Sequence, residues 1–193
     1  LIRYMSETEN QLQILLCELA AYLHNKDMEI NVWDQIIAFE GRMHEFIKAA
    51  YDYQDNTFHS HPGYYIDYFE MRLAQLQVLH NLHYEIKKIR KMPKQALVIA
   101  DYIMYMADYV VEMNIPDQQI EKLEEISEQM KQEELPKTRE EFEGRALLYH
   151  ILMDLEEFLV YKKRFVNGLD EKKLRIYWKQ EMEQKDSANE LQK

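Results

Sequence analysis

Apolar residues recur every three or four positions along most of the chain, which is the spacing of amphipathic helices. In the first such segment, one face is marked by Leu12, Leu15, Leu16, Leu19 and Leu23. The pattern predicts seven helices, over about residues 6–24, 31–53, 64–91, 94–113, 118–134, 139–166 and 170–184. Residues 187–193 lack the pattern, so we expect a frayed tail there.

The fourth predicted helix is apolar nearly all round. Its acidic residues, Asp101, Asp108 and Glu112, would fall on one narrow stripe, because seven and eleven residues each return close to the same helical angle. A helix with so little polar surface is either central in its domain or covered by a second copy, and it favours self-association. The fifth helix has a thin apolar stripe among many glutamates and is expected at the periphery.

Several residues mark helix starts or interrupt a helix. Asn31 is a candidate N-cap of the second helix. Thr138 and Glu141 have the spacing of a capping box, in which each side chain accepts a hydrogen bond from the other residue's backbone N–H. Gly41 lies inside the second helix, where it costs about 1 kcal/mol relative to alanine. A close crossing with another helix would explain it.

Glycine and proline number only four each, too few for a turn-rich β fold, and no linker divides the 193 residues. Long helices joined by short connections favour antiparallel neighbours. We therefore predict an all-α fold. It should be an antiparallel bundle of long helices with one or two shorter peripheral helices, and a single domain over residues 1–186.

The formal net charge is −11, which repels nucleic-acid phosphates, so no nucleic-acid partner is expected. Cys17 is the only cysteine, and its apolar surroundings predict an inert core thiol with a raised pKa. No signal peptide is visible, and no stretch reaches the roughly 18 uninterrupted apolar residues of a membrane span. The chain begins with Leu1 in sequence that already predicts a helix, which favours a piece of a longer protein; a processed N-terminus is the alternative.

Residues for catalysis are scarce. The chain has no Gly-x-Ser-x-Gly elbow, no glycine-rich phosphate loop and no Cys-x-x-Cys pair, so we expect neither an enzyme nor a bound cofactor. His80 and His83 share a helix face and could chelate a metal with acidic residues of the fourth helix, and His59 and His61 lie in a loop. Because the Glu-x-x-His signature of di-iron bundles is missing, half-buried helical histidines and no metal site are expected.

Arg72 is a candidate ligand-binding residue, with Tyr68 one turn before it and Tyr65 two turns before it. A guanidinium pairs with a carboxylate, and flat tyrosine rings pack against an aromatic body, so the three residues suit a small aromatic acid. In the alternative interpretation, Arg72 pairs with a nearby acid and the tyrosines belong to the core.

Five cations gather around Pro93: Lys87, Lys88, Arg90, Lys91 and Lys94. On an otherwise acidic molecule this basic cluster could face an anionic membrane surface, where each cation contributes about 1 kcal/mol. The alternative is a solvated helix end whose cations complement the helix dipole.

Two segments resemble a known family: Tyr64-Tyr65-Ile66-Asp67-Tyr68-Phe69-Glu70-Met71-Arg72 and Leu135-Pro136-Lys137-Thr138-Arg139-Glu140-Glu141-Phe142-Glu143, the second continuing into Gly144-Arg145-Ala146. On these segments the chain resembles the C-terminal domain of the bacterial putative aromatic acid exporter family. The family usually has asparagine where this chain has Gly144, so helix packing is expected to differ there. We expect structural ion pairs at the start of the sixth helix from Arg139, Glu143 and Arg145.

The resemblance implies a membrane-spanning N-terminal half followed by a cytoplasmic helical domain, of which this chain is the second, and it implies no catalytic residues. We therefore interpret the chain as a cytoplasmic accessory or regulatory domain on the inner side of the bacterial plasma membrane, serving assembly, gating or ligand sensing. Expected partners are the transmembrane half, a second copy, an anionic membrane surface and a small aromatic acid. The alternatives are a free-standing cytosolic protein that senses such an acid or a partner helix, and a metal-dependent enzyme.

Overall fold

The computed structural model describes residues 1–25, 31–58 and 63–178. Every regular element in these ranges is a helix, and none is a strand. The elements are α1 (Ile2–His24), α2 (Val32–Asp55), α3 (Gly63–Lys88), α4 (Ala96–Ala107), α5 (Asp117–Lys131), α6 (Arg139–Asn167) and α7 (Glu171–Tyr177). The predicted all-α bundle is confirmed.

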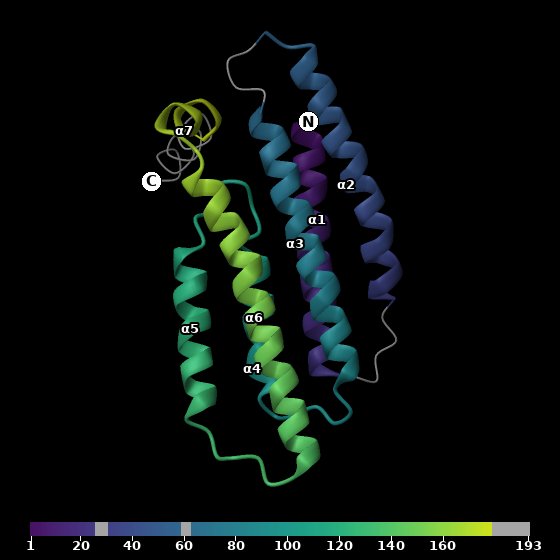
Figure 1. Ribbon diagram of the computed structural model, residues 1–193, viewed down its shortest axis with the longest axis vertical. Coiled ribbons are helices and arrows are strands. Elements are labelled where there is room, and N and C mark those ends of the chain that lie inside the picture. The colour runs from purple at the N-terminus through teal and green to yellow at the C-terminus, as the bar shows by residue number, and fades with distance from the viewer. Residues whose placement is uncertain (26–30, 59–62, 179–193) are drawn as a thin grey trace, which may run out of the picture.

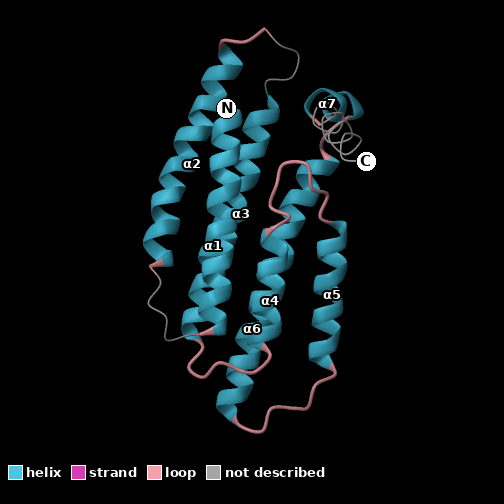
Figure 2. Ribbon diagram, turned by 180° about the vertical axis from the view of Figure 1, so that it is seen from behind, coloured by secondary structure: helices cyan, strands magenta, loops and turns pink. Residues whose placement is uncertain are grey.

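Helices α1 to α6 run alternately up and down the long axis, so consecutive helices are antiparallel (Figure 1). The closest packing is between α3 and α6, between α1 and α4, and between α2 and α3. Helix α5 lies at one edge against α6, at the periphery as predicted, and Figure 2 shows α4 beside α1 from behind. Leu1 and α7 lie at one end of the bundle, and the loop between α3 and α4 lies at the other.

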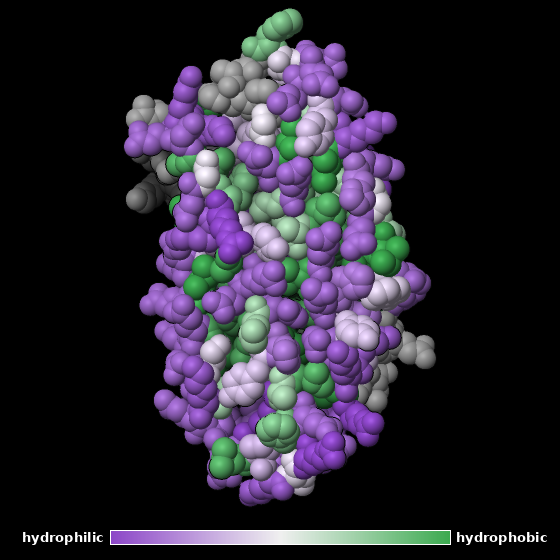
Figure 3. Space-filling view, in the orientation of Figure 1, coloured by the Kyte–Doolittle hydropathy of each residue, from purple (hydrophilic) through white to green (hydrophobic). Residues whose placement is uncertain are grey.

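One apolar core runs through the bundle from Met5 to Trp178. The leucine face predicted for α1 is fully buried in it. Burying a leucine side chain contributes about 1.5–3 kcal/mol, so this face fixes how α1 is turned. Outside the core, the side seen in Figure 3 is mostly hydrophilic, with small apolar patches between the polar side chains.

Helix α4 is shorter than predicted, because it ends at Ala107 and not near residue 113. Asp108 and Glu112 therefore lie beyond it, and the predicted acidic stripe does not exist. The helix is also not buried all round. Leu97 and Met104 remain 44% and 48% exposed on its outer face, while Tyr102 is buried and its hydroxyl donates to the Gln119 carbonyl, 2.6 Å away.

Two of the predicted local contacts in other helices are confirmed. Asn31 caps α2, because its side chain accepts a hydrogen bond from the Asp34 N–H. In the first turns of α6, Arg139 pairs with Glu143 at 2.8 Å. Both contacts join residues three or four positions apart, which is why spacing alone could predict them.

The capping box at the start of α6 is only half formed. Thr138 Oγ1 accepts from the Glu141 N–H at 3.1 Å, as predicted. The Glu141 carboxylate does not return to the Thr138 N–H; one oxygen accepts from the Lys137 N–H at 2.9 Å and the other binds Arg145, also at 2.9 Å. The same carboxylate thus satisfies a backbone donor before the helix and the predicted ion pair of Arg145 within it.

Two helical glycines have opposite surroundings. A Cβ added at Gly41 would meet nothing within 4 Å, so the close helix crossing that we expected there is wrong. A Cβ at Gly144 would lie 3.0 Å from Pro93 Cγ and 3.4 Å from the Lys91 carbonyl oxygen. Gly144 therefore allows the loop before α4 to lie directly against α6, and an asparagine there would require this loop to shift by a few tenths of an ångström.

Some expectations fall outside the described residues: His59 and His61, the part of the seventh helix beyond residue 178, and the tail over residues 187–193. None of the described helices combines the length and the apolar character needed to span a membrane.

Candidate functional site

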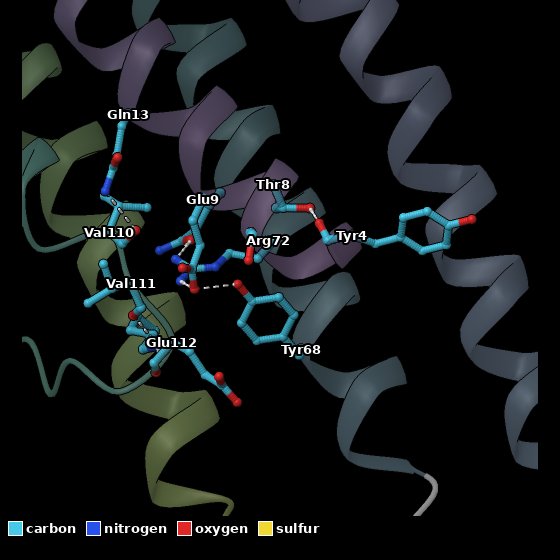
Figure 4. A network of polar contacts seen from close by, with 12 residues as sticks. Tyr4, Thr8, Glu9, Gln13, Tyr68, Arg72, Val110, Val111 and Glu112 are labelled. Atoms are coloured by element: carbon cyan, nitrogen blue, oxygen red, sulfur yellow. Dashed lines mark hydrogen bonds and ion pairs between the residues drawn. The ribbon is translucent and has the colours of Figure 1, made fainter. Parts of the chain in front are cut away.

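A polar core is buried where α1, α3 and α6 meet. Arg72 is 1% exposed, lies over the Tyr68 ring at 5.1 Å and pairs with Glu9 at 3.4 Å. The Tyr68 hydroxyl donates to the same Glu9 oxygen at 2.8 Å (Figure 4). Burial raises the pKa of Tyr68, so this hydroxyl stays a donor. One carboxylate of α1 therefore holds two side chains of α3.

Arg72 is also tied to α6 through Gln75. Arg72 donates to the side-chain oxygen Oε1 of Gln75 at 2.9 Å, and the side-chain Nε2 of Gln75 donates to the Phe158 backbone carbonyl at 2.8 Å. Arg72 Nε is buried without a hydrogen-bond partner among the described residues. The cavity beside it has about 10 Å³, the size of a single water molecule.

Lys162 of α6 is the second buried cation, at 4% exposure. Its Nζ donates to the Val111 carbonyl at 3.0 Å and to the Glu112 carbonyl. Burial lowers its pKa well below the usual value, and the Arg72 charge lowers it further. These two carbonyls accept hydrogen bonds from two of the N–H groups of the Lys162 amine.

The segment between α4 and α5 is held by these long side chains together with short turns, in which the Val110 N–H donates to the Ala107 carbonyl at 3.1 Å and the Asn114 N–H donates to the Val111 carbonyl at 3.4 Å. Besides the two carbonyls bound by Lys162, the Val110 carbonyl accepts from Gln13 of α1 at 3.3 Å (Figure 4). The Glu112 carboxylate turns inward and accepts from the Tyr64 hydroxyl at 2.5 Å. Three helices, α1, α3 and α6, thus meet at this segment through polar contacts.

Tyrosine rings form an aromatic shelf, which we define as Tyr53, Tyr64 and Tyr65. The Tyr65 ring stands edge-on to Tyr53, with centroids 5.7 Å apart, and to Tyr64 at 5.6 Å. Tyr177 of α7 stacks on Tyr64 with centroids 4.0 Å apart and planes 6° apart. The Nε1–H of Trp178, the residue directly after α7, donates to the Tyr64 hydroxyl at 3.1 Å. The shelf therefore also binds the C-terminal end of α7.

The structure brings together two members of the predicted ligand site. Arg72 and Tyr68 are in contact, but the rings that surround Tyr65 belong to the aromatic shelf. Beside Arg72 the cavity has no room for an aromatic acid, and the guanidinium already pairs with Glu9. Aromatic-acid binding at Arg72, Tyr68 and Tyr65 stays a prediction, and in this conformation it would require the polar core to open.

Sequence reasoning missed Glu9 and Lys162. Glu9 lies 63 residues before Arg72, and no local spacing connects them. Lys162 had a visible signal, because it continues the inward positions Leu155 and Phe158 along α6. A lysine at such a position is either partnered inside the protein or extended to the surface, and the sequence does not decide between these.

The basic cluster lies at one end of the bundle. All five side chains are exposed, with Lys87 and Lys88 in the last turn of α3 and the other three in the loop that follows. This end is opposite the one that carries Leu1 (Figure 1). Lys91 and Lys94 also line a surface hollow of about 370 Å³ together with residues at the start of α6.

The remaining candidates serve packing. His80 lies against the Trp33 ring and 3.6 Å from Glu40, and burial lowers the pKa of His83. Within the described ranges, no three side chains of the metal-binding types converge. Cys17 is half-buried, and burial raises the pKa of its thiol, as predicted.

The fold and these contacts define a helical domain with an internally partnered polar core. The family model for the putative aromatic acid exporter C-terminal domain matches residues 1–163. Because the match covers most of the chain, the chain belongs to this family, and the resemblance seen in its two motifs is confirmed.

Two relatives extend the comparison. Uncharacterized protein YqjA of Bacillus subtilis (strain 168) is 27% identical over 170 residues, which are 86% of this chain and 51% of that protein. The chain thus spans about half the length of this curated relative. A crystal structure of a putative membrane protein from Clostridium difficile 630 shares the fold, with a TM-score of 0.74 and 24% identity over 84% of this chain and 96% of that one.

Proposed function

We propose that the chain is a non-catalytic accessory domain on the cytoplasmic side of an exporter-like membrane protein, where it serves assembly, gating or ligand sensing. The observation that carries this proposal is the polar core. The two buried cations, Arg72 and Lys162, are bound to a carboxylate, an amide and backbone carbonyls and do not face an open cleft. Groups held in this way position helices, whereas general acids, bases and nucleophiles need access to a substrate.

The polar core also suits a domain that transmits a change of position. Lys162 on α6 and Gln13 on α1 hold adjacent carbonyls of the segment between α4 and α5. A shift of that segment would break hydrogen bonds to two helices at once. Buried networks of this kind respond as a unit, because each broken bond leaves an unpaired group away from water.

The net charge of the chain supports the proposal that the domain lies beside the cytoplasmic loops of a membrane protein. The loops of membrane proteins on the cytoplasmic side carry an excess of lysine and arginine. A domain of net charge −11 is attracted to such loops. The relative of about twice the length supports the presence of a further half, which is the proposed transmembrane partner.

Reporter fusions to the full-length protein test the location. A fluorescent protein fused at the C-terminus should fluoresce, and alkaline phosphatase fused at the same place should be inactive, because the first matures in the cytoplasm and the second outside it. The reverse result would exclude a cytoplasmic domain. Recovery of the untagged protein in the soluble fraction would instead favour a free-standing cytosolic binding protein.

Deletion of the domain from the full-length protein tests its role. We expect the membrane half to lose assembly or the efflux of aromatic acids, while a purified domain shows no turnover of such acids. Full efflux by the truncated protein would contradict an accessory role.

A further inference from the structure

The aromatic shelf already holds a ring, and this ring comes from the C-terminal part of the same chain. We propose that Tyr177 is the internal occupant of a slot for a phenol-type aromatic ring, formed by Tyr64 and Tyr65. Helix α7 is then a strap that a free ring of this type can displace. This inference rests on the ligand-sensing role within the proposed function, and it names the ligand class.

The surroundings of Tyr177 have the geometry of a ring-binding slot. Tyr64 presents its face to the Tyr177 ring, with centroids 4.0 Å apart and planes 6° apart. The Tyr65 ring lies nearly perpendicular to the Tyr177 ring, with centroids 5.7 Å apart and planes 81° apart. Tyr53 supports Tyr65 from the far side, edge-on at 5.7 Å. Rings arranged as a stack and an edge contribute about 0.5–1.5 kcal/mol per pair beyond their burial.

The strap is an element that can leave without unfolding the bundle. Helix α7 has only seven residues, too few to be stable by itself in water. It is attached through side chains: the stacked Tyr177, the buried Trp178 and the partly buried Leu174. The main helix pairs of the bundle do not include it.

The slot and its occupant belong to different parts of the chain. Tyr53, Tyr64 and Tyr65 lie within residues 1–163, the part that the family model matches. Tyr177 and Trp178 lie beyond it. The shelf residues therefore lie in the part of the chain that the family model matches, and the strap lies after it.

The chemistry of the slot selects a phenol. Its present occupant is a phenol ring, and the Tyr64 hydroxyl accepts a hydrogen bond from Trp178 Nε1 while it donates to Glu112. When the strap leaves, the acceptor position on the Tyr64 oxygen becomes free. A phenol can stack on Tyr64 where the Tyr177 ring was, as the present occupant does.

Removal of the internal ring is the first test. The Tyr177→Ala chain should bind phenol and 4-hydroxybenzoate in calorimetric titrations at least about tenfold more tightly than the wild type, because no internal ring competes for the slot. Cyclohexanol, which cannot stack, should not bind. Tyr161→Ala is the matched control, since Tyr161 is a half-buried tyrosine of α6 outside the shelf, and it should bind like the wild type. The double variant Tyr65→Ala/Tyr177→Ala should lose binding.

Nuclear magnetic resonance of the wild-type chain is the second test. The chain has two tryptophans, Trp33 and Trp178, and the Trp33→Phe variant assigns their indole N–H signals. Saturating 4-hydroxybenzoate should shift the Trp178 signal, whose N–H loses its bond to Tyr64, and leave the Trp33 signal unchanged. A folded Tyr177→Ala chain that does not bind, equal binding by all variants, or a shift of Trp33 alone would overturn the proposal. None of these outcomes touches the accessory role, which is tested in the full-length protein.

Discussion

At the scale of single residues, Gly41 and Gly144 affect stability in different ways. Gly41 only lowers the helix propensity of α2, whereas Gly144 leaves space for a neighbouring loop. Gly41 is exposed and has no neighbour within 4 Å of an added Cβ. Gly41→Ala should therefore raise the free energy of unfolding by about 0.5–1 kcal/mol, through the restored helix propensity alone. Urea denaturation monitored by circular dichroism measures this change.

Gly144→Asn should act in the opposite direction. Its Cβ would lie 3.0 Å from Pro93 Cγ, so Pro93 must shift by a few tenths of an ångström in a closely packed contact. Crowding of this kind costs about 1–3 kcal/mol. Equal effects of the two substitutions in the same denaturation experiment would contradict the close packing at Gly144.

Asp154 is a carboxylate that burial destabilises. Burial, with the charges of Glu85 and Glu157 next, raises the pKa of Asp154 from 3.8 to about 6, and His150 lowers it only in part. One of its oxygens, Oδ2, is buried without a partner among the described residues. Because the folded state binds the proton more tightly than the unfolded state, stability falls as pH rises from about 4 to 6 and stays lower above that range.

Asp154→Asn should remove this pH dependence. At pH 7.5 we expect a gain of about 1 kcal/mol in the free energy of unfolding, less than the full 1.36 kcal/mol per pKa unit because the side chain is partly exposed. At pH 4 the variant and the wild type should be equally stable. A gain of the same size at both pH values, in parallel urea titrations, would show that the charge of Asp154 is not its cause.

At the scale of elements, the segment that follows α4 is held by a side chain of another helix. The carbonyls of Val111 and Glu112 accept hydrogen bonds from Lys162 of α6, and the Val111 carbonyl also accepts from the Asn114 N–H. In an isolated peptide the apolar sequence would continue as helix, since neither glycine nor proline interrupts it before Pro116. The tertiary contact therefore stabilises the turns that replace the last part of the predicted helix.

Lys162→Met should cost about 1–3 kcal/mol of unfolding free energy, because the Glu112 carbonyl loses its donor and the Val111 carbonyl keeps only the Asn114 N–H. Hydrogen exchange should accelerate most in residues 108–116. The neighbouring Lys163→Met is the matched control: Lys163 makes a surface ion pair with Asp117, and its loss should cost less than about 1 kcal/mol. Similar effects of the two substitutions would disprove the anchoring role of Lys162.

At the scale of the whole molecule, charge is unevenly distributed. The chain has a net charge of −11, but five cations lie exposed at the end of the bundle opposite Leu1. The membrane-facing role of this cluster stays a prediction. If it holds, the chain binds anionic vesicles, and reversal of Lys87, Lys88 and Lys91 to glutamate weakens binding by about 3 kcal/mol or more.

Lys48→Glu and Lys172→Glu provide a control at exposed lysines of α2 and α7, away from the cluster. Co-sedimentation with vesicles at low salt measures all three proteins. Equal binding of the wild type and the reversed cluster would refute the membrane-facing role, and no binding by the wild type would leave the solvated helix end as the interpretation.

Self-association also stays a prediction, and α4 gives it a surface. Leu97, Val98 and Met104 are each at least 44% exposed on this helix. Sedimentation equilibrium should show a concentration-dependent dimer that Met104→Lys shifts to monomer. Met153→Lys, at a more exposed position on α6, should leave the dimer intact. A wild type that is monomeric at the highest concentration would end this prediction.

Predictions from the sequence were correct where the interacting residues are close together in the chain, and incomplete where they are far apart. The leucine face of α1, the Asn31 cap and the Arg139–Glu143 pair were predicted, because their partners recur within one or two turns. The pairing of Arg72 with Glu9 was only an open alternative, since an unspecified acid anywhere in the chain could fill that role. The shelf could not be predicted for the same reason, because it combines residues of α2 and α3 that are brought together only by helix packing, and its occupant comes from α7.

The sequence by itself determined that the protein is a bundle of helices from this family, because periodic burial and short motifs act locally. Only the tertiary structure decided where α4 ends, which carboxylate neutralises Arg72 and which ring fills the shelf. The physical reason is that a buried charge or aromatic face must find a partner away from water, and the helix that supplies this partner is known only once the helices have packed.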